Sequence, residues 1–401
     1  MFSEIDLVIL AGGKGTRLGL LTKKIPKPIL KIKNFFFLDY ILMFYSKYLF
    51  KNIVIIAGHN GEKIKIKYDK KIYNLSRIRV IIEKNPKGTA HALYKIKNHI
   101  STRFLLINGD SFCDFDLFKI KPHTLKNCLG VMILIKNKTY SENKKLSNLK
   151  ICEKNNISFS QKPPFMMNAG IYFFNKKILN LIKKKKSLED ELLPELITKK
   201  KIKGINHDGF FIDIGIKRNL ILAKKILPKK FLKPAVFLDR DGVINEDFGY
   251  VSNFKRFKFK KNIITSLKKI SNGNFYLFIV TNQSGIARGY FSEKKFLDFQ
   301  KKINIILQKK KIYIYDTQYC PFHTNGKILK YKKKSILRKP DNGMFKNIEK
   351  KFLIDIKNSY LLGDKEIDKK MAKKSHLKFF YADKHVKTIT KKIVNNFCKK
   401  I

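Results

Sequence analysis

The chain has 401 residues, of which 44% are hydrophobic and 12% aromatic, so it can bury ordinary cores and is not a wholly disordered protein. Its length favours two domains over one. No stretch reaches the roughly 18–20 apolar residues that cross a bilayer, and the first residues lack the positive charge that opens a secretory signal. Five scattered cysteines suit a reducing compartment better than a disulfide framework. We therefore expect a soluble, cytoplasmic protein with no membrane partner.

The chain is strongly basic, with 87 Lys and Arg against 31 Asp and Glu and a net charge of +56. Such an excess normally indicates nucleic acid or an acidic surface as the partner. However, only nine of the 87 basic residues are Arg, the residue that base edges and phosphates favour. The lysines occur in short runs along the whole chain, interleaved with Ile, Asn and Phe. We interpret them as compositional drift at solvated positions and expect no nucleic-acid partner, with a dedicated basic surface as the alternative.

Short apolar runs that end in polar loops predict buried parallel strands, which alternate with helical stretches. In the first half these runs occupy residues 5–13, 52–60, 78–86 and 103–110. The pattern then restarts, with runs at 234–242, 275–285 and 359–368. Between the two sets lies a lysine-rich segment, 223–234, with two prolines and no strong periodicity. We expect the boundary there, giving an α/β protein with domains at residues 1–228 and 229–401, each long enough for its own core.

The first half has its clearest motif in LAGGKGTRL (10–18), where a predicted strand opens into a turn with glycines at 12, 13 and 15. Glycine lets the backbone approach a phosphate and point consecutive N–H groups at it. Arg17 and Lys27 then supply positive charge for a triphosphate. The spacing matches neither the dinucleotide motif nor the P-loop. Taken alone, this motif is equally compatible with a plain glycine-rich turn.

Together with later segments, this motif resembles the signature of the sugar-phosphate nucleotidyltransferases over most of residues 5–220. The segments that carry the resemblance are PKP (26–28), KGTAHAL (87–93), INGD (107–110), QKPPFMMNAGIYFF (161–174) and FFIDIG (210–215). The resemblance implies a Rossmann-like nucleotidyltransferase fold, in which a sugar 1-phosphate attacks the α-phosphorus of a nucleoside triphosphate and expels pyrophosphate. Positioning and metal neutralisation would then do most of the catalytic work.

The same resemblance implies the residues of this site. Asp110 and Asp213 would bind Mg²⁺, which prefers oxygen ligands. Arg17 would face the leaving phosphates, and Lys27 the α-phosphate and the attacking phosphate. The residues that would bind the nucleotide are Leu10, Ala11, Gly12, Gly13, Gly15, Thr16, Gly88 and Thr89.

The sugar-binding part of the motif departs from the family in one place. Lys162 and Asn168 would contact the sugar, but residue 161 is Gln where the family has Glu, which leaves that sugar-hydroxyl contact open. The stretch SLEDELLPEL (187–196) is similar to one found in the subgroup that acts on mannose-like sugars and heptoses.

The second half opens with FLDRDGVIN (237–245), which places Asp239 and Asp241 at the end of a predicted strand. Residues two apart on an extended segment point the same way, so both carboxylates can converge on one site. Paired carboxylates repel each other unless a cation or a shared proton lies nearby. A coincidental acidic turn is the alternative for this segment alone.

With VTNQSG (280–285), RKP (338–340) and GDKEID (363–368), this segment resembles the four motifs of the haloacid dehalogenase superfamily of phosphatases. The resemblance implies a Rossmann-like fold with a minimal cap and Asp239 as the nucleophile that forms an aspartyl-phosphate. Asp241 would be the general acid and base, and its carbonyl would join Asp239 and Asp364 around Mg²⁺. The residues implied for the phosphoryl oxygens are Thr281 and Lys339, with Asp368 orienting Lys339.

Within that superfamily, the second half is similar to the D-glycero-D-manno-heptose 1,7-bisphosphate 7-phosphatases. The segments that carry this are DRDGVINEDFGYV (239–251), TNQSGIARGYFS (281–292), YCPFH (319–323) and LRKPDNGM (337–344). The analogy implies that Arg338 and Asn282 contact the substrate. Those phosphatases often have a Cys/His zinc loop, but here Phe322 replaces the expected His, and the residues where the second cysteine pair would stand are Ser335 and Leu337. Cys320 and His323 cannot make a closed four-coordinate site, so we expect no zinc.

The two halves make sense as consecutive steps on one sugar. A phosphatase would leave heptose 1-phosphate, and a nucleotidyltransferase would convert this product to a nucleotide-activated heptose for surface glycans such as lipopolysaccharide. A resemblance to the heptose 1-phosphate guanylyltransferases implies GTP, although an adenine- or cytosine-using enzyme would keep the same phosphate loop. The open alternatives are another sugar phosphate such as mannose 1-phosphate, a non-catalytic first half, and a polynucleotide 3′-phosphatase on a basic scaffold.

Overall fold

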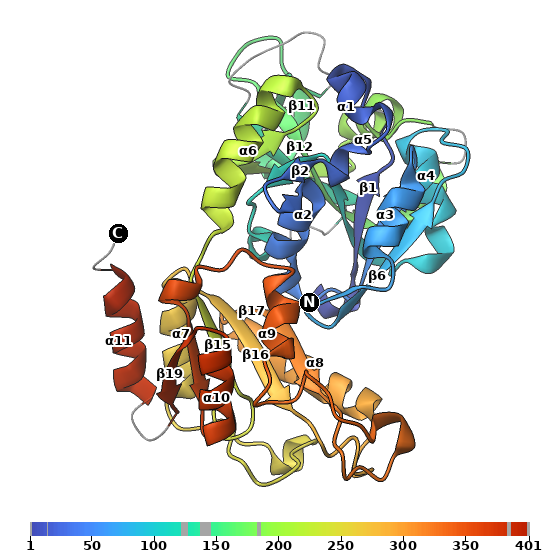
Figure 1. The fold of residues 1–401 in the computed structure, drawn as a ribbon. Helices are drawn as coiled ribbons and strands as arrows, with labels where there is room; N and C mark the ends of the chain where they lie inside the picture. The colour runs from blue at the N-terminus through green and yellow to red at the C-terminus, as the bar shows by residue number, and fades with distance from the viewer. Residues whose placement is uncertain are drawn as a thin grey trace. The chain divides into compact units, whose positions relative to one another are not determined.

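The structure, a computed structural model, describes residues 2–13, 15–121, 127–136, 146–182, 186–382 and 386–398. Its contacts divide the chain into two compact α/β units (Figure 1). The first consists of Met1–Phe44, Phe50–Ile72 and Ser76–Leu227, and the second of Tyr45–Leu49, Tyr73–Leu75 and Pro228–Ile401. Within the described residues, no helix is both long and apolar enough to cross a membrane.

The first unit is built on a large sheet whose centre is parallel. Its central strands run in the order β7 (Arg103–Asn108), β1 (Asp6–Ala11), β4 (Asn52–Ala57) and β6 (Ser76–Ile82). Both β4 and β7 pair with β1 in parallel register, and β6 pairs with β4 in the same way. These are the four strands that the apolar runs predict, so that prediction is confirmed. Their carboxyl ends meet at one edge of the sheet, where a ligand is expected in open α/β folds.

The rest of this sheet was not predicted from the sequence. β12 (Met166–Asn175) pairs in antiparallel register with β7, and also with β9 (Gly130–Lys136) and β10 (Leu149–Ile151). The remaining strands of the unit are β13 (Ile202–His207), β11 (Ile157–Phe159), β5 (Ile72–Tyr73), β2 (Lys31–Ile32), β3 (Phe35–Phe36), β8 (Ser111–Cys113) and β14 (Phe211–Asp213). Several are only two or three residues long, too short to show a hydrophobic period.

The helices of the first unit cover the sheet (Figure 1). They are α1 (Leu20–Lys23), α2 (Phe37–Tyr45), α3 (Gly61–Tyr68), α4 (Thr89–Lys95), α5 (Leu193–Thr198) and α6 (Lys217–Phe231). Helix α6 corrects the interpretation of 223–234 as a segment without periodicity. Its buried positions are Leu220, Ala223, Leu227 and Phe231, spaced by three or four residues as on one helical face. Pro228 lies inside the helix and hid this period, because proline normally ends one.

The second unit has a five-stranded parallel sheet in the order β17 (Ile314–Cys320), β16 (Tyr276–Asn282), β15 (Ala235–Leu238), β18 (Tyr360–Gly363) and β19 (Lys378–Tyr381). The predicted strands at 234–242, 275–285 and 359–368 are confirmed as β15, β16 and β18. The helices of this unit are α7 (Ile263–Asn272), α8 (Glu293–Lys309), α9 (Gly343–Glu349), α10 (Glu366–Lys374) and α11 (Val386–Cys398). Because β15 is central, the residues that follow it lie between the loops of both neighbouring strands.

Candidate active sites

The turn after β1 requires glycine at two positions, one in the turn itself and one on a neighbouring strand end. Gly58, which follows β4, lies so close to Gly12 that a Cβ on it would be 2.8 Å from the Gly12 carbonyl oxygen. Gly15 has a φ of +72°, in the left-handed region that favours glycine, and its carbonyl accepts a hydrogen bond of 2.8 Å from Thr22 Oγ1. The sequence motif predicted the glycines of this turn but not the part played by Gly58, which lies on another strand.

A cavity of about 410 Å³ opens beside this turn. The predicted residues that line it are Leu10, Ala11, Gly12, Gly13, Lys27, Gly88, Thr89 and Asp110. They come from the carboxyl ends of β1 and β7, the loop before α4, and the turn that holds Lys27. The structure therefore gathers segments that are far apart in the sequence around one space with backbone donors and a carboxylate.

An ion pair lies in this cavity, with 3.0 Å between Lys27 Nζ and Asp110 Oδ2. The small sheet of β8 and β14 pairs Asp213 with Ser111, the neighbour of Asp110, and the Ile214 N–H donates to the Asp110 carbonyl at 2.9 Å. This pairing places Asp213 opposite the residue that follows Asp110. Asp213 does not line the cavity, and its Oδ1 accepts a hydrogen bond of 2.6 Å from the Gly215 N–H. Carboxylate oxygens such as these are the ligands that Mg²⁺ prefers.

The other predicted residues of the first unit do not line the cavity. Gly15 and Thr16 lie in the turn beyond it, and Arg17 lies beside Gly215, next to Asp213. Lys162 is exposed. Asn168 donates to the Tyr172 hydroxyl and accepts a hydrogen bond of 2.9 Å from the Gly170 N–H, so its amide already has protein partners.

Sequence reasoning missed three polar residues that line the same cavity: Glu83, Asn108 and Glu189. Thr89 Oγ1 donates to Glu189 Oε2 at 3.0 Å, and the Leu188 N–H donates to Thr89 Oγ1 at 2.8 Å. Burial raises the pKa of the Glu189 carboxyl, and Asp190 and Asp110 add to the rise. The only signal for Glu189 was its place in the 187–196 stretch, since no motif separates it from its acidic neighbours.

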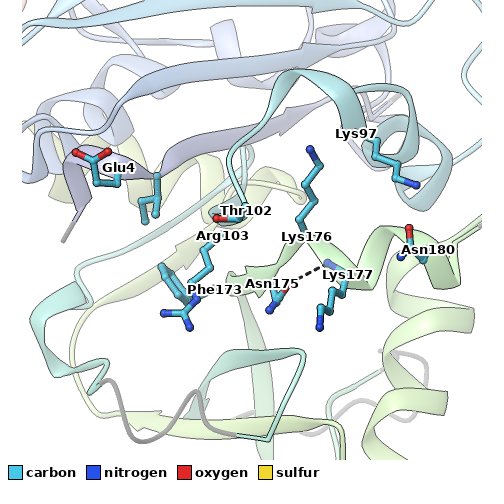
Figure 2. Close-up of a pocket in the computed structure, with 10 residues that line it drawn as sticks. Glu4, Lys97, Thr102, Arg103, Phe173, Asn175, Lys176, Lys177 and Asn180 are labelled. Carbon is cyan, nitrogen blue, oxygen red and sulfur yellow. Dashed lines mark hydrogen bonds between the residues drawn. The ribbon is translucent and has the colours of Figure 1, made fainter.

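A larger cavity of the first unit, about 720 Å³, lies at the opposite edge of the sheet (Figure 2). It is lined by residues at the start of β1 and β7 and the end of β12, among them Arg103 and Lys176. The Lys176 ammonium donates to the Ile100 carbonyl at 3.3 Å. None of the predicted site residues lines this cavity.

In the second unit, three charged side chains form a buried chain at the end of β15. Lys339 Nζ lies 2.7 Å from Asp239 Oδ2 and 2.6 Å from Asp368 Oδ1. Burial raises the pKa of Asp239 to about 6, although Lys339 opposes the rise. Burial alone would lower the pKa of Lys339, but the two carboxylates raise it. The lysine is therefore held as a cation between the predicted nucleophile and the predicted orienting aspartate.

The residues around Asp239 fit a divalent cation. One oxygen from each of Asp239, Asp364 and Asp368 lies within 4.8 Å of the other two. Asp364 Oδ1 is buried, and no described residue donates a hydrogen bond to it. Gly242 has a φ of +85°, and a Cβ there would collide with the Asp364 carboxylate, so glycine is what allows that carboxylate to approach. A buried oxygen without a donor, beside two more carboxylates, is a donor set that suits Mg²⁺.

The carboxylate of Asp241 lies outside this cluster. It accepts hydrogen bonds of 2.8–3.1 Å from the Arg240 guanidinium, 2.9 Å from Asn245 and 2.9 Å from Gln283. Gln283 also donates to Thr281 Oγ1 at 3.0 Å, which connects two predicted site residues. Sequence reasoning missed Arg240, which is fully buried, because the motif marks only the aspartates on either side of it.

Asn282 forms two hydrogen bonds with the backbone of Lys339. Its Oδ1 accepts from the Lys339 N–H at 3.0 Å, and its Nδ2 donates to the Lys339 carbonyl at 3.2 Å. Asn282, which the sequence predicts to contact the substrate, therefore holds the backbone of the loop that contains Lys339 in this structure. The neighbouring Arg338 is half-buried and reaches the Phe322 carbonyl with Nη1 at 3.5 Å.

The two residues considered for zinc are Cys320, the last residue of β17, and His323, in the loop that follows. Cys320 is fully buried, with Sγ 3.7 Å from the Phe322 carbonyl, and the Asn325 N–H donates to His323 Nδ1 at 3.0 Å. Across the described ranges, the one group of three or more metal-ligating side chains is the aspartate cluster.

Two family models match separate parts of the chain. The family model described as nucleotidyl transferase matches residues 7–230, and the model described as polynucleotide kinase 3 phosphatase matches residues 242–397. A D-glycero-beta-D-manno-heptose-1,7-bisphosphate 7-phosphatase of Haemophilus influenzae is 41% identical over 139 residues, 35% of this chain and 75% of the relative. A D-glycero-alpha-D-manno-heptose-1,7-bisphosphate 7-phosphatase of Photorhabdus laumondii is 41% identical over 132 residues, which are 33% of this chain and 72% of the relative.

Among solved structures, HddC from Yersinia pseudotuberculosis is 27% identical, with a TM-score of 0.46, and the match covers 55% of this chain and 98% of that one. The chain belongs to the nucleotidyl transferase family over residues 7–230 and to the family of heptose-bisphosphate 7-phosphatases in its C-terminal half, and it is a bifunctional enzyme with a nucleotidyltransferase and a phosphatase domain.

Proposed function

We propose that the second half, from residue 229, removes the 7-phosphate of D-glycero-D-manno-heptose 1,7-bisphosphate, and that residues 1–228 join the resulting heptose 1-phosphate to a nucleotide. One observation carries this proposal. A segment of 139 residues that is 41% identical to a heptose-bisphosphate 7-phosphatase lies in the same polypeptide as a nucleotidyl transferase half. The product of the first reaction would keep its 1-phosphate, which is the group that a sugar nucleotidyltransferase uses as its nucleophile.

In the phosphatase reaction, Asp239 Oδ2 would attack the phosphorus of the 7-phosphate and form an aspartyl-phosphate, while the bond to the sugar oxygen breaks. Asp241 would give its proton to that oxygen. The same carboxylate would then take a proton from water as the water attacks phosphorus and releases inorganic phosphate and free Asp239. Lys339, fixed 2.7 Å from Asp239, is placed to stabilise the phosphoryl oxygens, together with the Thr281 hydroxyl.

Mg²⁺ is the cofactor that we propose for both sites. In the phosphatase it would be held by Asp239, Asp364 and the Asp241 carbonyl, and in the nucleotidyltransferase by Asp110 and Asp213. When bound, it would neutralise negative charge on the phosphoryl group under attack. Two observations support this. No described residue donates a hydrogen bond to the buried Asp364 Oδ1, and β14 pairs Asp213 with Ser111, the residue that follows Asp110.

In the nucleotidyltransferase, an oxygen of the sugar 1-phosphate would attack the α-phosphorus and pyrophosphate would leave. The backbone of Gly12 and Gly13 would lie against the triphosphate, Lys27 would neutralise the two reacting phosphates and Arg17 the leaving ones. We propose GTP as the nucleotide because the motifs of this half resemble those of the heptose 1-phosphate guanylyltransferases. The 3.0 Å pair of Lys27 and Asp110 would then be a resting arrangement that substrate phosphates replace.

Two substrate panels test this proposal with the purified enzyme and Mg²⁺. The first measures phosphate release from the α and β anomers of the heptose 1,7-bisphosphate, from mannose 1-phosphate and from fructose 1,6-bisphosphate. The second supplies heptose 1-phosphate with GTP, ATP, CTP or UTP and measures pyrophosphate. The proposal predicts that a heptose bisphosphate is the best phosphatase substrate and that GTP gives the fastest pyrophosphate release. Preference for another sugar in the first panel would overturn the heptose assignment, and faster pyrophosphate release with another nucleotide in the second would overturn the choice of GTP.

A second candidate for the phosphatase half is a polynucleotide 3′-phosphatase. The match of residues 242–397 to the polynucleotide kinase 3 phosphatase model and the net charge of +56 favour it. It predicts removal of a 3′-phosphate from a DNA end and binding that weakens steeply with salt, because each neutralised phosphate releases a counterion. A sugar-phosphate enzyme would leave the DNA end intact and show little retention on DNA at physiological salt.

A further inference from the structure

A buried histidine–aspartate pair lies in the first unit, outside every motif of the sequence. His207 is the last residue of β13, and its side chain is 7% exposed. Its Nε2 lies 2.8 Å from Asp114 Oδ1, and the ring N–H is the donor because an ionised carboxylate can only accept. His207 Nδ1 is buried, and no described residue forms a hydrogen bond with it. The hydrogen bond of this imidazole is therefore directed at Asp114.

Asp114 holds the start of β14 through the backbone of Phe210. It directly follows β8, and its N–H donates to the Phe210 carbonyl at 3.1 Å, while the Phe210 N–H donates to Asp114 Oδ1 at 2.8 Å. Phe210 directly precedes β14. One carboxylate oxygen thus accepts from the imidazole at the end of β13 and from the backbone at the start of β14. Loss of that oxygen would leave both donors without this acceptor.

The turn between β13 and β14 packs directly on this pair. A Cβ on Gly209 would lie 2.4 Å from His207 Cε1 and 2.5 Å from Asp114 Oδ1, so a larger residue would fit there only if the pair moved. In addition, the rings of His207 and Phe115 meet edge to face, with centroids 5.5 Å apart. The orientation of the imidazole is therefore fixed by packing as well as by its hydrogen bond.

At its other end, β14 carries Asp213, one of the two aspartates proposed to bind Mg²⁺. The strand has three residues and pairs with β8 in a two-stranded sheet. Two such short strands are at best marginally stable by themselves. Beyond Asp213, the Ile214 N–H donates to the Asp110 carbonyl at 2.9 Å. The position of Asp213 thus depends on contacts at both ends of this small sheet, and the Asp114–His207 pair provides those at the end away from Asp110.

We propose that Asp114 and His207 are positioning residues for nucleotidyl transfer, which hold β14 so that the Asp213 carboxylate stays beside Asp110. Neither of the two lines the nucleotide cavity. This inference rests on the proposed function of the first half and adds to it the support of one metal ligand. Removing a residue that orients a metal ligand typically costs about 10–100-fold in metal affinity or activity. A pair that served only fold stability would leave the Mg²⁺ requirement of the folded enzyme unchanged.

The first test measures two Mg²⁺ requirements on one sample: the concentration for half-maximal pyrophosphate release from heptose 1-phosphate and GTP, and that for half-maximal phosphate release from heptose 1,7-bisphosphate. Asp114→Ala removes the acceptor for both donors and should raise the first by about tenfold or more, while the second stays at the wild-type value. Asp114→Asn keeps a side-chain oxygen as acceptor and should restore most of the wild-type requirement. Asp208→Ala removes an exposed carboxylate from the same turn and is the matched control. An unchanged requirement in a folded Asp114→Ala protein would overturn the inference.

A second measurement needs neither substrate nor metal. Hydrogen–deuterium exchange is followed by mass spectrometry in the peptide of residues 208–216 of the wild type, Asp114→Ala and His207→Phe. Both variants should exchange faster than the wild type in this peptide, whereas unchanged exchange in the peptides of β1 and β4 shows that the unit is folded. His207→Phe keeps a ring against Phe115 and makes the same comparison if Asp114→Ala does not fold. Wild-type exchange over this peptide in both variants would contradict the support of β14 by the pair.

Together, the two measurements separate this inference from the proposed function. If the wild type released no pyrophosphate with any of the nucleotides, the proposed function would fail, and the positioning role with it. Faster exchange over residues 208–216 with an unchanged Mg²⁺ requirement would overturn the positioning role alone, because the pair would then stabilise β14 without affecting Asp213. Faster exchange together with the raised requirement, and recovery in Asp114→Asn, is the result that the inference predicts.

Discussion

The ammonium group of Lys339 lies 2.7 Å from Oδ2 of Asp239, although Asp239 follows strand β15 and Lys339 lies in the loop before α9. The side chain of Lys339 is fully buried and also lies 2.6 Å from Asp368, whereas the side chain of Asp239 keeps 10% of its surface exposed. Removing one partner of such a buried pair usually costs about 3–5 kcal/mol. Here Asp368 provides a second partner, which allows the nucleophile to be changed without leaving the lysine unpaired.

Asp239→Asn should therefore fold and should lose at least about a thousandfold in phosphate release, because an amide cannot form the aspartyl-phosphate. Pyrophosphate release from supplied sugar 1-phosphate and GTP should be unchanged. Asp298→Asn, at an exposed position on α8, is the matched control and should keep both activities. Loss of both activities in a folded Asp239→Asn protein would contradict independent sites.

Asp110→Asn should have the opposite effect. The amide oxygen can still accept from Lys27, which preserves the local structure, but it is a weaker ligand for Mg²⁺ than a carboxylate. We expect nucleotidyl transfer to fall by about a hundredfold or more while phosphate release is retained. The two rates are measured on one sample, with Asp208→Asn, an exposed carboxylate, as the control. Equal loss of both rates would show that the two reactions share a site.

Gly242→Ala tests the packing of glycine against Asp364. A left-handed φ costs an alanine about 1–2 kcal/mol, and here the new Cβ would also displace the Asp364 carboxylate. Gly249→Ala is the matched variant, because its φ is +69° and nothing lies within 4 Å of the added Cβ. Both should lower the free energy of unfolding, but only Gly242→Ala should raise the Mg²⁺ concentration needed for half-maximal phosphate release. The same Mg²⁺ requirement in both variants would contradict Asp364 as a ligand.

Asn282→Ala separates a positioning role from substrate contact. If the side chain acts by holding the Lys339 backbone, kcat for phosphate release should fall about 10–100-fold with little change in KM. Asn282→Asp keeps the acceptor for the Lys339 N–H and should lose less. A large rise in KM with an unchanged kcat would instead support the direct substrate contact that the sequence motif implies.

Cys320→Ser tests the zinc prediction. The buried hydroxyl should cost about 1–3 kcal/mol of unfolding free energy, but the melting temperature of neither the wild type nor the variant should depend on a zinc-selective chelator. A drop in the wild-type melting temperature with the chelator, reversed by added zinc, would show that a zinc site exists.

The sequence predicted the parts of the fold that have strong local signals. The seven parallel strands were visible because each is an apolar run that ends in a polar loop, and Asp110, Asp239 and Asp364 follow such runs. Helix α6 was missed because Pro228 hid the spacing of Leu220, Ala223 and Leu227. The strands β10 and β11 were missed because segments of three residues show no period.

The residues of the two sites were likewise predictable only where a local motif marks them. The identities of Asp239 and Lys339 were predicted from motifs, but their contact depends on how the loops after β15 and before α9 meet. Arg240 could not be found, because its side chain is fixed by contacts with the Val251 carbonyl and Gln283, which no motif spacing records. Glu189 lines its cavity and accepts a hydrogen bond from Thr89, which lies a hundred residues away in the sequence. Such pairs form only when separate elements pack together.

We propose that the two sites act in succession on one sugar. This order is tested by following heptose 1,7-bisphosphate, GTP and Mg²⁺ with the wild-type enzyme by ³¹P NMR over time. Inorganic phosphate should appear first, and pyrophosphate and a nucleotide-linked heptose should follow after a lag. With Asp239→Asn, neither inorganic phosphate nor a nucleotide-linked heptose without a 7-phosphate should form. Nucleotide-linked sugar that appears before any inorganic phosphate, and still carries its 7-phosphate, would contradict the proposed order.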